Sequence, residues 1–285
     1  EFYTPEYSRL YDSFFSFEDG SAQKRLVEYQ NICFAPEGDA YAFTTNEAGQ
    51  VKVWLKTENQ RKPKCILKRY QKIEDNPDYT FPLLAWHPQG SVLGVTTEQK
   101  GHCYYYPYNL ESKKWEKRFL VDVEKITSWS YSDDGKMMLF SGFKNGQSDI
   151  FLYSFLSRSF QNITNDYYDD YAPISIGKQK QIVFSSTRPR DSISLKDDFM
   201  KADKQTTYDL FLYEYAKKDS ALLRITNTPL ANEYDAQRVA PQQIVYLSDE
   251  SGVVNRYFAQ FDSSISRIDT AIHYVYFAKS HPLTD

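Results

Sequence analysis

A sequence motif of two short apolar runs separated by a turn recurs along this chain. It reads WSYSDDGKMMLFSG at 129–142 and LAWHPQGSVLGVTT at 84–97, and it returns at 32–45, 172–186 and 236–249, with degraded turns in the last two copies. Each copy predicts a β-hairpin, because Gly, Asp and Asn accept the backbone angles of a tight turn and the flanking runs are rich in Val, Phe, Tyr and Leu. The chain must therefore fold from repeated hairpins.

A third and a fourth strand follow each hairpin. The third strands are aromatic runs that begin at Val51, Cys103, Asp149, Asp209 and Arg256. The fourth strands end in phrases such as FQNITND at Asp166, LLRITNT at Thr228 and HPLTD at Asp285. A four-stranded unit thus recurs five times, at a spacing of roughly 40 to 60 residues, which lies in the range of propeller repeats.

This repeat is typical of a β-propeller, because one four-stranded sheet cannot bury both faces alone and must stack on neighbours around an axis. The alternative, an all-β sandwich, would not require the same turn and closing phrase in every unit. We therefore predict an all-β fold, a β-propeller of four-stranded blades with five blades visible in the chain. The predicted blades span approximately 28–75, 76–122, 123–166, 167–228 and 229–285. Residues 1–27 are predicted to be an N-terminal extension or the tail of a preceding domain, with a short helix at 22–27.

Composition agrees with a large core and excludes several kinds of partner. The 285 residues are 41% hydrophobic and include 24 Tyr and 19 Phe, which suits one large domain. A net charge of −4 without a basic cluster argues against nucleic acid, and no apolar run reaches the ~18 residues of a membrane helix. Residues 1–27 lack the apolar core of a signal peptide.

Cys33, Cys65 and Cys103 show no metal or redox spacing, so we predict three small core residues on strands.

The third and fourth units resemble the repeat of TolB-type propellers, which joins Thr-Asn-Asp, an aromatic and acidic loop, Pro, a Ser-Pro-Asp-Gly turn and a third strand with Asp-Ile-Tyr. The matching residues here are Ser132, Asp134 and Gly135 of the turn, Asn165, Asp166 and Pro173 of the loop, and Asp149 and Asp209 of the third strand. Asp133 replaces the Pro of the turn. Longer phrases such as YDLFLYEY, RITNTP and YLSDESGVVNRYFAQFDSSISRIDT resemble the propeller region of large bacterial envelope proteins of this type, over residues 28–285.

This resemblance implies a six-bladed architecture, although five blades are visible. The sixth would lie beyond this chain or be supplied in part by residues 1–27. The resemblance also implies a periplasmic or outer-membrane-associated location.

Motifs of catalysis are missing from the sequence. It has no Gly-x-Ser-x-Gly elbow, His-Glu-x-x-His pair, P-loop or dinucleotide fingerprint. The four histidines, His87, His102, His273 and His281, are so dispersed that a metal or acid–base site would have to be assembled across distant blades. We therefore predict that the chain is not an enzyme and has no catalytic residues and no cofactor.

The loops are more informative than the motifs. In a propeller the connections from fourth to first strand and from second to third strand emerge on one face, around the mouth of the axial channel. On this face the sequence places two acidic, tyrosine-rich loops, NDYYDDY and NTPLANEYD, and an insertion of about twenty residues at 187–207, a length that is usually functional or disordered. We predict a protein or peptide partner there, bound by Tyr167, Tyr168, Asp169, Asp170, Arg188, Arg190, Glu233, Tyr234 and Asp235, because Tyr and Arg are favoured at interface hot spots.

A structural interpretation competes with this one. Asn165, Asp166, Asn227, Asp149 and Asp209 are expected to cap turns, and the tyrosines could lean on the adjacent blade. A third interpretation places a Ca²⁺ ion among Asp166, Asp169 and Asp170, because Ca²⁺ takes several oxygen ligands, but the loop lacks the Gly and the ligand spacing of a dedicated calcium loop.

The sequence thus favours a non-catalytic propeller that acts as a protein-interaction or scaffold module of a bacterial cell-envelope protein. One alternative is the gating propeller of a larger hydrolase of the prolyl-oligopeptidase type, whose catalytic domain lies outside this chain. Another is a carbohydrate-active propeller, which predicts aromatic platforms and paired carboxylates in the channel.

Overall fold

The structure is a computed structural model that describes residues 27–47, 49–70, 80, 82–120, 123–177, 180–193, 205–216, 220–268 and 272–284. The predicted N-terminal extension and its short helix lie outside the described residues, apart from Val27.

The described strands form five antiparallel sheets, blades 1 to 5. Blade 1 consists of β1 (Glu28–Phe34), β2 (Ala40–Glu47), β3 (Gln50–Thr57) and β4 (Lys64–Tyr70). Blade 2 consists of β5 (Leu83–Trp86), β6 (Val92–Gln99), β7 (His102–Asn109), β8 (Lys114–Trp115) and β9 (Arg118–Leu120). Blade 3 consists of β10 (Lys125–Tyr131), β11 (Met137–Lys144), β12 (Gln147–Ser154) and β13 (Phe160–Asn162). Blade 4 consists of β14 (Asp170–Ile176), β15 (Gln181–Ser186), β16 (Asp209–Glu214) and β17 (Leu223–Arg224). Blade 5 consists of β18 (Glu233–Ala240), β19 (Gln243–Ser248), β20 (Asn255–Ile268) and β21 (Ile272–Pro282).

In four of these sheets the strands lie in chain order, first to fourth. Blade 2 differs because its outer strand is divided, so that β8 and β9 both pair with β7. The three cysteines are free thiols and lie on the strands β1, β4 and β7 as predicted, but of the three only Cys103 is buried in the core, whereas Cys33 and Cys65 are half-buried.

The first hairpin of each of blades 1 to 3 closes through a glycine turn. Gly38, Gly90 and Gly135 have φ angles of 75°, 72° and 68°, which an L side chain adopts only with strain. Their amides donate to the carbonyls of Ala35, His87 and Ser132 at 2.8 to 2.9 Å. The predicted hairpin turns of these three blades are therefore confirmed.

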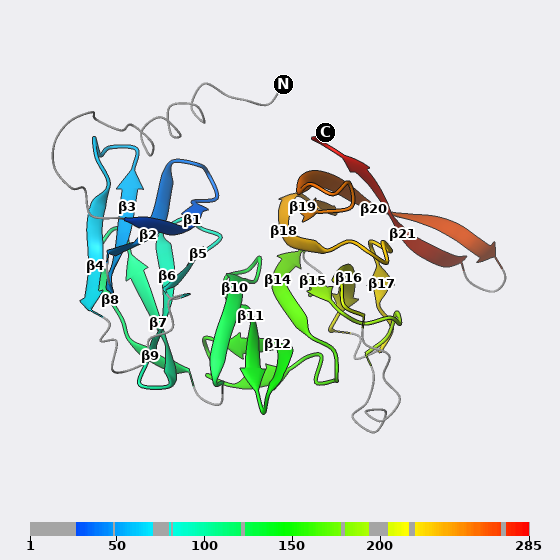
Figure 1. Ribbon diagram of the computed structural model, residues 1–285, viewed down its shortest axis with the longest axis horizontal. Coiled ribbons are helices and arrows are strands. Elements are labelled where there is room, and N and C mark those ends of the chain that lie inside the picture. Colours follow the sequence, from blue (N-terminus) through cyan, green and yellow to red (C-terminus); the bar gives the residue numbers. More distant parts are fainter. Residues whose placement is uncertain are drawn as a thin grey trace.

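The five blades lie side by side along an arc, with the first strand of each on the inner side (Figure 1). Apolar side chains fill every space between consecutive blades. Examples are Val53 against Leu93, Tyr105 against Trp129, Leu152 against Phe184, and Val183 against Ile244. This packing is why the unit repeats, since each sheet buries a face on the next. The arc is open between blades 1 and 5 (Figure 1), and the sixth blade stays a prediction.

The fourth strands of blades 3 and 4 end earlier than the sequence predicts. In blade 3 the strand was expected to reach Asp166, but β13 ends at Asn162. After it, the hydroxyl of Thr164 takes over as acceptor for the amide of Ile150 at 3.0 Å. Side-chain oxygens thus replace the backbone ladder, and the chain then crosses to blade 4.

The described residues include no helix with the length and apolar character needed to span a membrane.

Candidate functional site: the central cavity and its rim

Irregularities in the first strands shape the centre of the molecule. The register of β1, β10, β14 and β18 shifts between Gln30 and Cys33, Ile126 and Ser128, Tyr171 and Ile174, and Tyr234 and Gln237. Within three of these shifts a non-glycine residue has φ of 51°, namely Asn31, Ala172 and Asp235. Such bulges bend a strand and re-aim its side chains. Four of the five blades therefore turn their inner strand at a similar position.

Hydrogen bonds join consecutive blades beside these bulges. The hydroxyl of Ser128 accepts from the amide of Ala172 at 3.0 Å, and Ser130 donates to the carbonyl of Pro173 at 2.8 Å. Between blades 1 and 2, the amide side chain of Asn31 donates to the carbonyl of Pro82 at 2.7 Å. The wall of the central opening is thus held together through its own irregular backbone.

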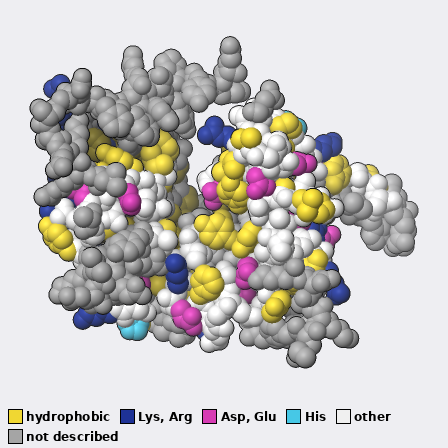
Figure 2. All heavy atoms as spheres, viewed as in Figure 1, with side chains coloured by type: hydrophobic (Ala, Val, Ile, Leu, Met, Phe, Trp, Pro, Cys, Tyr) yellow, Lys and Arg dark blue, Asp and Glu magenta, His cyan; other side chains and the backbone are white. Residues whose placement is uncertain are grey.

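A cavity of about 550 Å³ occupies this centre, and all five blades contribute to its lining. One part of the wall is apolar, formed by Ile32, Leu83, Leu84, Val245 and Leu247. The other part is polar and aromatic, formed by Thr127, Ser128, Trp129, Tyr171, Asp235, Gln237 and Arg256. Figure 2 shows the molecule hollowed between the two arms of the arc.

Two opposite charges line the cavity without a described counter-ion. Neither the carboxylate of Asp235 nor the guanidinium of Arg256 makes an ion pair within the described part of the chain. Partial burial raises the pKa of Asp235. Burial, and then the charge of Asp235, raise the pKa of the Tyr171 phenol. A ligand with both charged and apolar groups would find a complement for each in this wall.

The connections that border the cavity meet on one face, as predicted. The amide of Thr187, after β15, donates to the carbonyl of Asp169, which precedes β14, at 3.1 Å. The amide of Glu233 donates to the carbonyl of Tyr208 at 2.8 Å, which joins the corresponding loops of blades 4 and 5. We call this face the rim.

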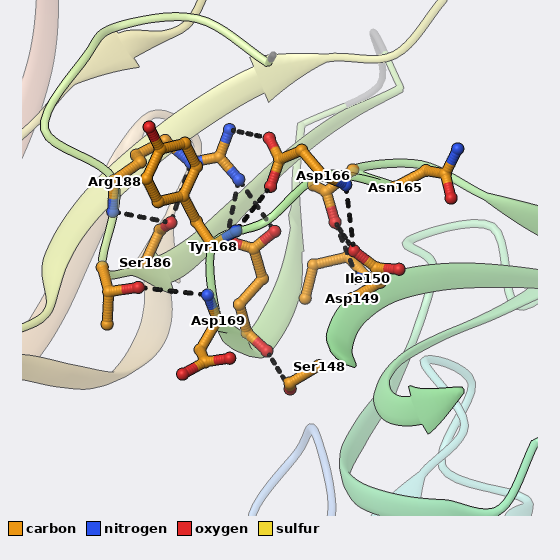
Figure 3. A network of polar contacts seen from close by, with 12 residues as sticks. Ser148, Asp149, Ile150, Asn165, Asp166, Tyr168, Asp169, Ser186 and Arg188 are labelled. Atoms are coloured by element: carbon orange, nitrogen blue, oxygen red, sulfur yellow. Dashed lines mark hydrogen bonds and ion pairs between the residues drawn. The ribbon is translucent and has the colours of Figure 1, made fainter. Parts of the chain in front are cut away.

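At the junction of blades 3 and 4 the rim contains a buried ionic network (Figure 3). The guanidinium of Arg188 donates to Asp166 at 3.0 Å and to both oxygens of Asp170 at 2.8 Å. All three side chains are at most 1% exposed. Burial lowers the pKa of Arg188, but the charges of Asp170 and Asp166 outweigh burial and raise it above its ordinary value. These residues fix the connection between two blades.

Four of the nine predicted partner residues therefore need correction. Tyr168, Asp170, Arg188 and Glu233 are buried, so in this structure their side chains cannot reach a partner. The physical reason is that each of these residues already makes contacts within the junction between two blades. The amide of Tyr168, for example, donates to Asp166 at 3.1 Å, and its ring lies 5.7 Å from the Arg188 guanidinium. The structural interpretation of Asp149, Asp166 and Asp209 fits their contacts at these turns.

The other five predicted residues remain accessible, but not all are near the cavity. Tyr167 is 41% exposed, Arg190 and Asp235 are exposed, and Asp169 and Tyr234 are half-buried. Of these, Asp235 lines the cavity.

The described start of the 187–207 insertion extends the outer edge of blade 4. Ser192 bridges to Ala221, and the amide of Ile193 donates to the carbonyl of Ser220 at 2.8 Å. Arg190 thus lies next to an outer strand rather than in the cavity lining. Residues 194–204 of the insertion lie outside the described residues.

The carboxylates that come together are Asp149, Asp166 and Asp170, not the predicted set with Asp169. Because Arg188 already supplies a positive charge to two of them, this cluster does not require a Ca²⁺ ion for neutrality, and we propose none.

Sequence reasoning missed the cavity lining, including Asn31, Trp129, Tyr171 and Arg256. One signal was available. Pro173 stands inside β14, and a proline within a strand often marks a bulge.

Comparisons with known proteins agree on the fold. No model of a known protein family and no curated protein matches the chain, but solved structures do. TolB from Acinetobacter baumannii matches with a TM-score of 0.53 and 13% identity, over 78% of this chain and 51% of that chain. Oligogalacturonate lyase from Vibrio parahaemolyticus matches with a TM-score of 0.55 and 10% identity, over 84% and 64%. Prolyl oligopeptidase B from Galerina marginata matches with a TM-score of 0.55 and 9% identity, over 89% and 38%.

The protein is therefore a β-propeller. Its fold is TolB-like, which confirms the resemblance seen in the repeated phrases. Identities of this size show the fold alone, because propellers host many unrelated functions. The chain spans less than two thirds of the length of each of these three proteins.

Proposed function

We propose that this propeller is a non-catalytic interaction module that binds a segment of a partner protein at the central cavity and the adjoining rim. The observation that carries the proposal is the composition of the cavity wall, which combines an apolar part with a polar part that contains Asp235 and Arg256, two opposite charges without a described counter-ion. One segment of a partner protein can present both charged and apolar side chains, and can therefore complement both parts of the wall. Exposed Tyr167 and half-buried Tyr234 add the kind of side chain that interfaces favour.

The bacterial cell envelope is the proposed location, either the periplasm or the outer membrane. The long phrases of the sequence and the likeness to TolB support this location.

The gating propeller of a larger hydrolase is the second candidate. It is favoured by the match to prolyl oligopeptidase B, which covers most of this chain but 38% of that chain. A Gly-x-Ser-x-Gly motif downstream of Asp285 in the complete gene would support it. The match to oligogalacturonate lyase raises the carbohydrate alternative, which needs paired carboxylates, whereas Asp235 is the one carboxylate among the described lining residues.

The partner can be tested by capture from detergent-solubilised envelope with four matched baits. These are the unchanged domain, Asp235→Arg, Tyr167→Ala and Leu156→Arg. Leu156 is 94% exposed in the turn between β12 and β13, on the face opposite the rim. We expect one partner that is retained by the unchanged domain and by Leu156→Arg, and that is reduced at least about tenfold by Asp235→Arg, because like charges placed opposite each other across an interface cost several kcal/mol. Equal capture by all four baits would refute the proposed site.

A further inference from the structure

The two described junctions on the acidic side of the rim share a set of corresponding hydrogen bonds. In the junction of blades 3 and 4, the amide of Ile150 donates to Thr164 at 3.0 Å, and the amide of Asp166 donates to Asp149 at 3.3 Å. In the junction of blades 4 and 5, the amide of Leu210 donates to Thr226 at 2.8 Å, and the amide of Thr228 donates to Asp209 at 3.3 Å. The two junctions therefore share this hydrogen-bonding pattern, with Thr228 at the position of Asp166.

The equivalence extends to the position of the arginine. Asp170 pairs with Ser186 in the register of blade 4, and Glu233 pairs with Ser248 in the register of blade 5. The amide of Arg188 donates to the hydroxyl of Ser186 at 3.3 Å, and the amide of Glu250 donates to that of Ser248 at 3.2 Å. Glu233 thus corresponds to Asp170, and Glu250 stands where the other junction has Arg188.

This exchange leaves Glu233 without the cation that its counterpart has. The side chain is 1% exposed. Its Oε1 accepts hydrogen bonds from the hydroxyls of Thr228 and Ser248, but its Oε2 has no partner among the described residues. Glu250 is exposed and does not bring a positive charge to the site. An ionised carboxylate buried in this way is costly.

The other charges that face this junction do not compensate. Asp209 on β16 is negative, and Arg224 on β17 is already paired with Asp209 and Asp191. Tyr246 on β19 and Tyr257 on β20 also lie near this junction. Burial is the largest cause of the raised pKa of both phenols, and the negative charges of Glu233 and Glu250 raise it further. Burial first, opposed by the bonds from Thr228 and Ser248 and reinforced by Asp209, raises the pKa of Glu233 to about 7.

We propose that Glu233 is a proton-controlled latch of the rim. When neutral, Glu233 holds the connection between blades 4 and 5 closed; when it loses its proton to solvent, it loosens that connection and the rim residues Tyr234 and Asp235 that follow it. The latch regulates the site described under the proposed function and rests on it only for the consequence that partner binding weakens as the pH rises.

The sign follows from the raised pKa. Opening exposes Glu233 to water, where its pKa returns to the ordinary value near 4.3. The closed junction is therefore fully favoured below that value, and this advantage is lost as the pH rises through about 7. With these two values, opening becomes about tenfold more frequent between pH 6 and pH 8.

Amide hydrogen exchange, corrected for the intrinsic pH dependence of exchange, measures this opening directly and needs no partner. We expect protection of the amides at 225–236 to fall about tenfold from pH 6 to pH 8, while the equivalent amides at 163–173 stay unchanged. Glu233→Gln should abolish the pH dependence. Glu250→Arg should restore protection at pH 8, because it recreates the pairing of Arg188, and Glu250→Gln is its control.

Equal protection of 225–236 at both pH values in the unchanged protein would overturn the latch, as would parallel loss at 163–173. If the variants fail to fold, a carbon-13 NMR titration of the Glu233 carboxyl in the unchanged protein decides. A midpoint near 7 supports the latch, and a midpoint near 4.5 refutes it. The proposed function fails separately, since it is judged by partner capture.

Discussion

At the scale of single residues, two neighbouring arginines of the rim occupy very different environments. Arg188 lies in the interior between Asp166 and Asp170, whereas Arg190, two residues later, is exposed. The sequence TRPRD does not distinguish the two arginines, so both were predicted to bind a partner. Burial depends on the turn that brings 166–170 beside 186–188, which is a tertiary contact and is not visible in a local pattern.

Arg188→Ala is expected to destabilise the domain by roughly 3–5 kcal/mol, because it leaves two buried carboxylates without a cation. The matched control, Arg190→Ala, should change the free energy of unfolding by no more than about 0.5 kcal/mol, since it removes an exposed side chain. Urea unfolding at pH 7 measures both. The Arg188→Met, Asp166→Asn, Asp170→Asn triple variant should recover part of the loss. A cost for Arg188→Ala as small as that for Arg190→Ala would contradict the assigned role.

At the scale of elements, the hairpins were predictable and the bulges were not. The turns at 35–38, 87–90 and 132–135 are recognisable in the sequence, because each has at its last position a glycine, the residue that adopts positive φ with least strain. The third strands were predictable from their aromatic runs. The bulges of the first strands depend on how neighbouring blades meet at the centre, so except at Pro173 the sequence contained no signal for them. The cavity lining was missed for the same reason.

The three glycine turns form a matched series for testing this element. Gly38 and Gly90 have open space around an added Cβ, whereas a Cβ on Gly135 would lie 2.0 Å from the Nε2 atom of His87. That imidazole is held in place, since it accepts from the amide of Gln89 at 3.2 Å and packs edge-on against Tyr131. We expect Gly90→Ala to cost about 1–2 kcal/mol from backbone strain and Gly135→Ala to cost more.

Thermal and urea unfolding of the two variants, alone and combined with His87→Ala, measures the difference. The excess cost of Gly135→Ala should shrink in the His87→Ala background, because the two changes are coupled through direct contact. Equal costs for Gly90→Ala and Gly135→Ala would show that the imidazole moves aside freely.

At the scale of the whole molecule, the sequence repeat predicts the propeller architecture. The five blades together form a central cavity that no single blade could form. Five sheets stack along an arc through their apolar faces. Each contributes between one and six residues to the lining of a common cavity. The sequence predicts a partner site on the loops of blades 3 to 5, whereas the central cavity of the structure is lined by blades 1 and 2 as well.

Site-specific photo-crosslinking tests the central claim of a partner at the cavity and rim most directly. A photoreactive amino acid is placed in turn at Asp235 in the cavity wall, at Tyr167 on the rim and at Leu156 on the opposite face, and each variant is irradiated with detergent-solubilised envelope. We predict one covalent adduct, of the same partner, from positions 235 and 167 and none from position 156. An adduct from position 156 alone, or equal labelling from all three positions, would contradict the account.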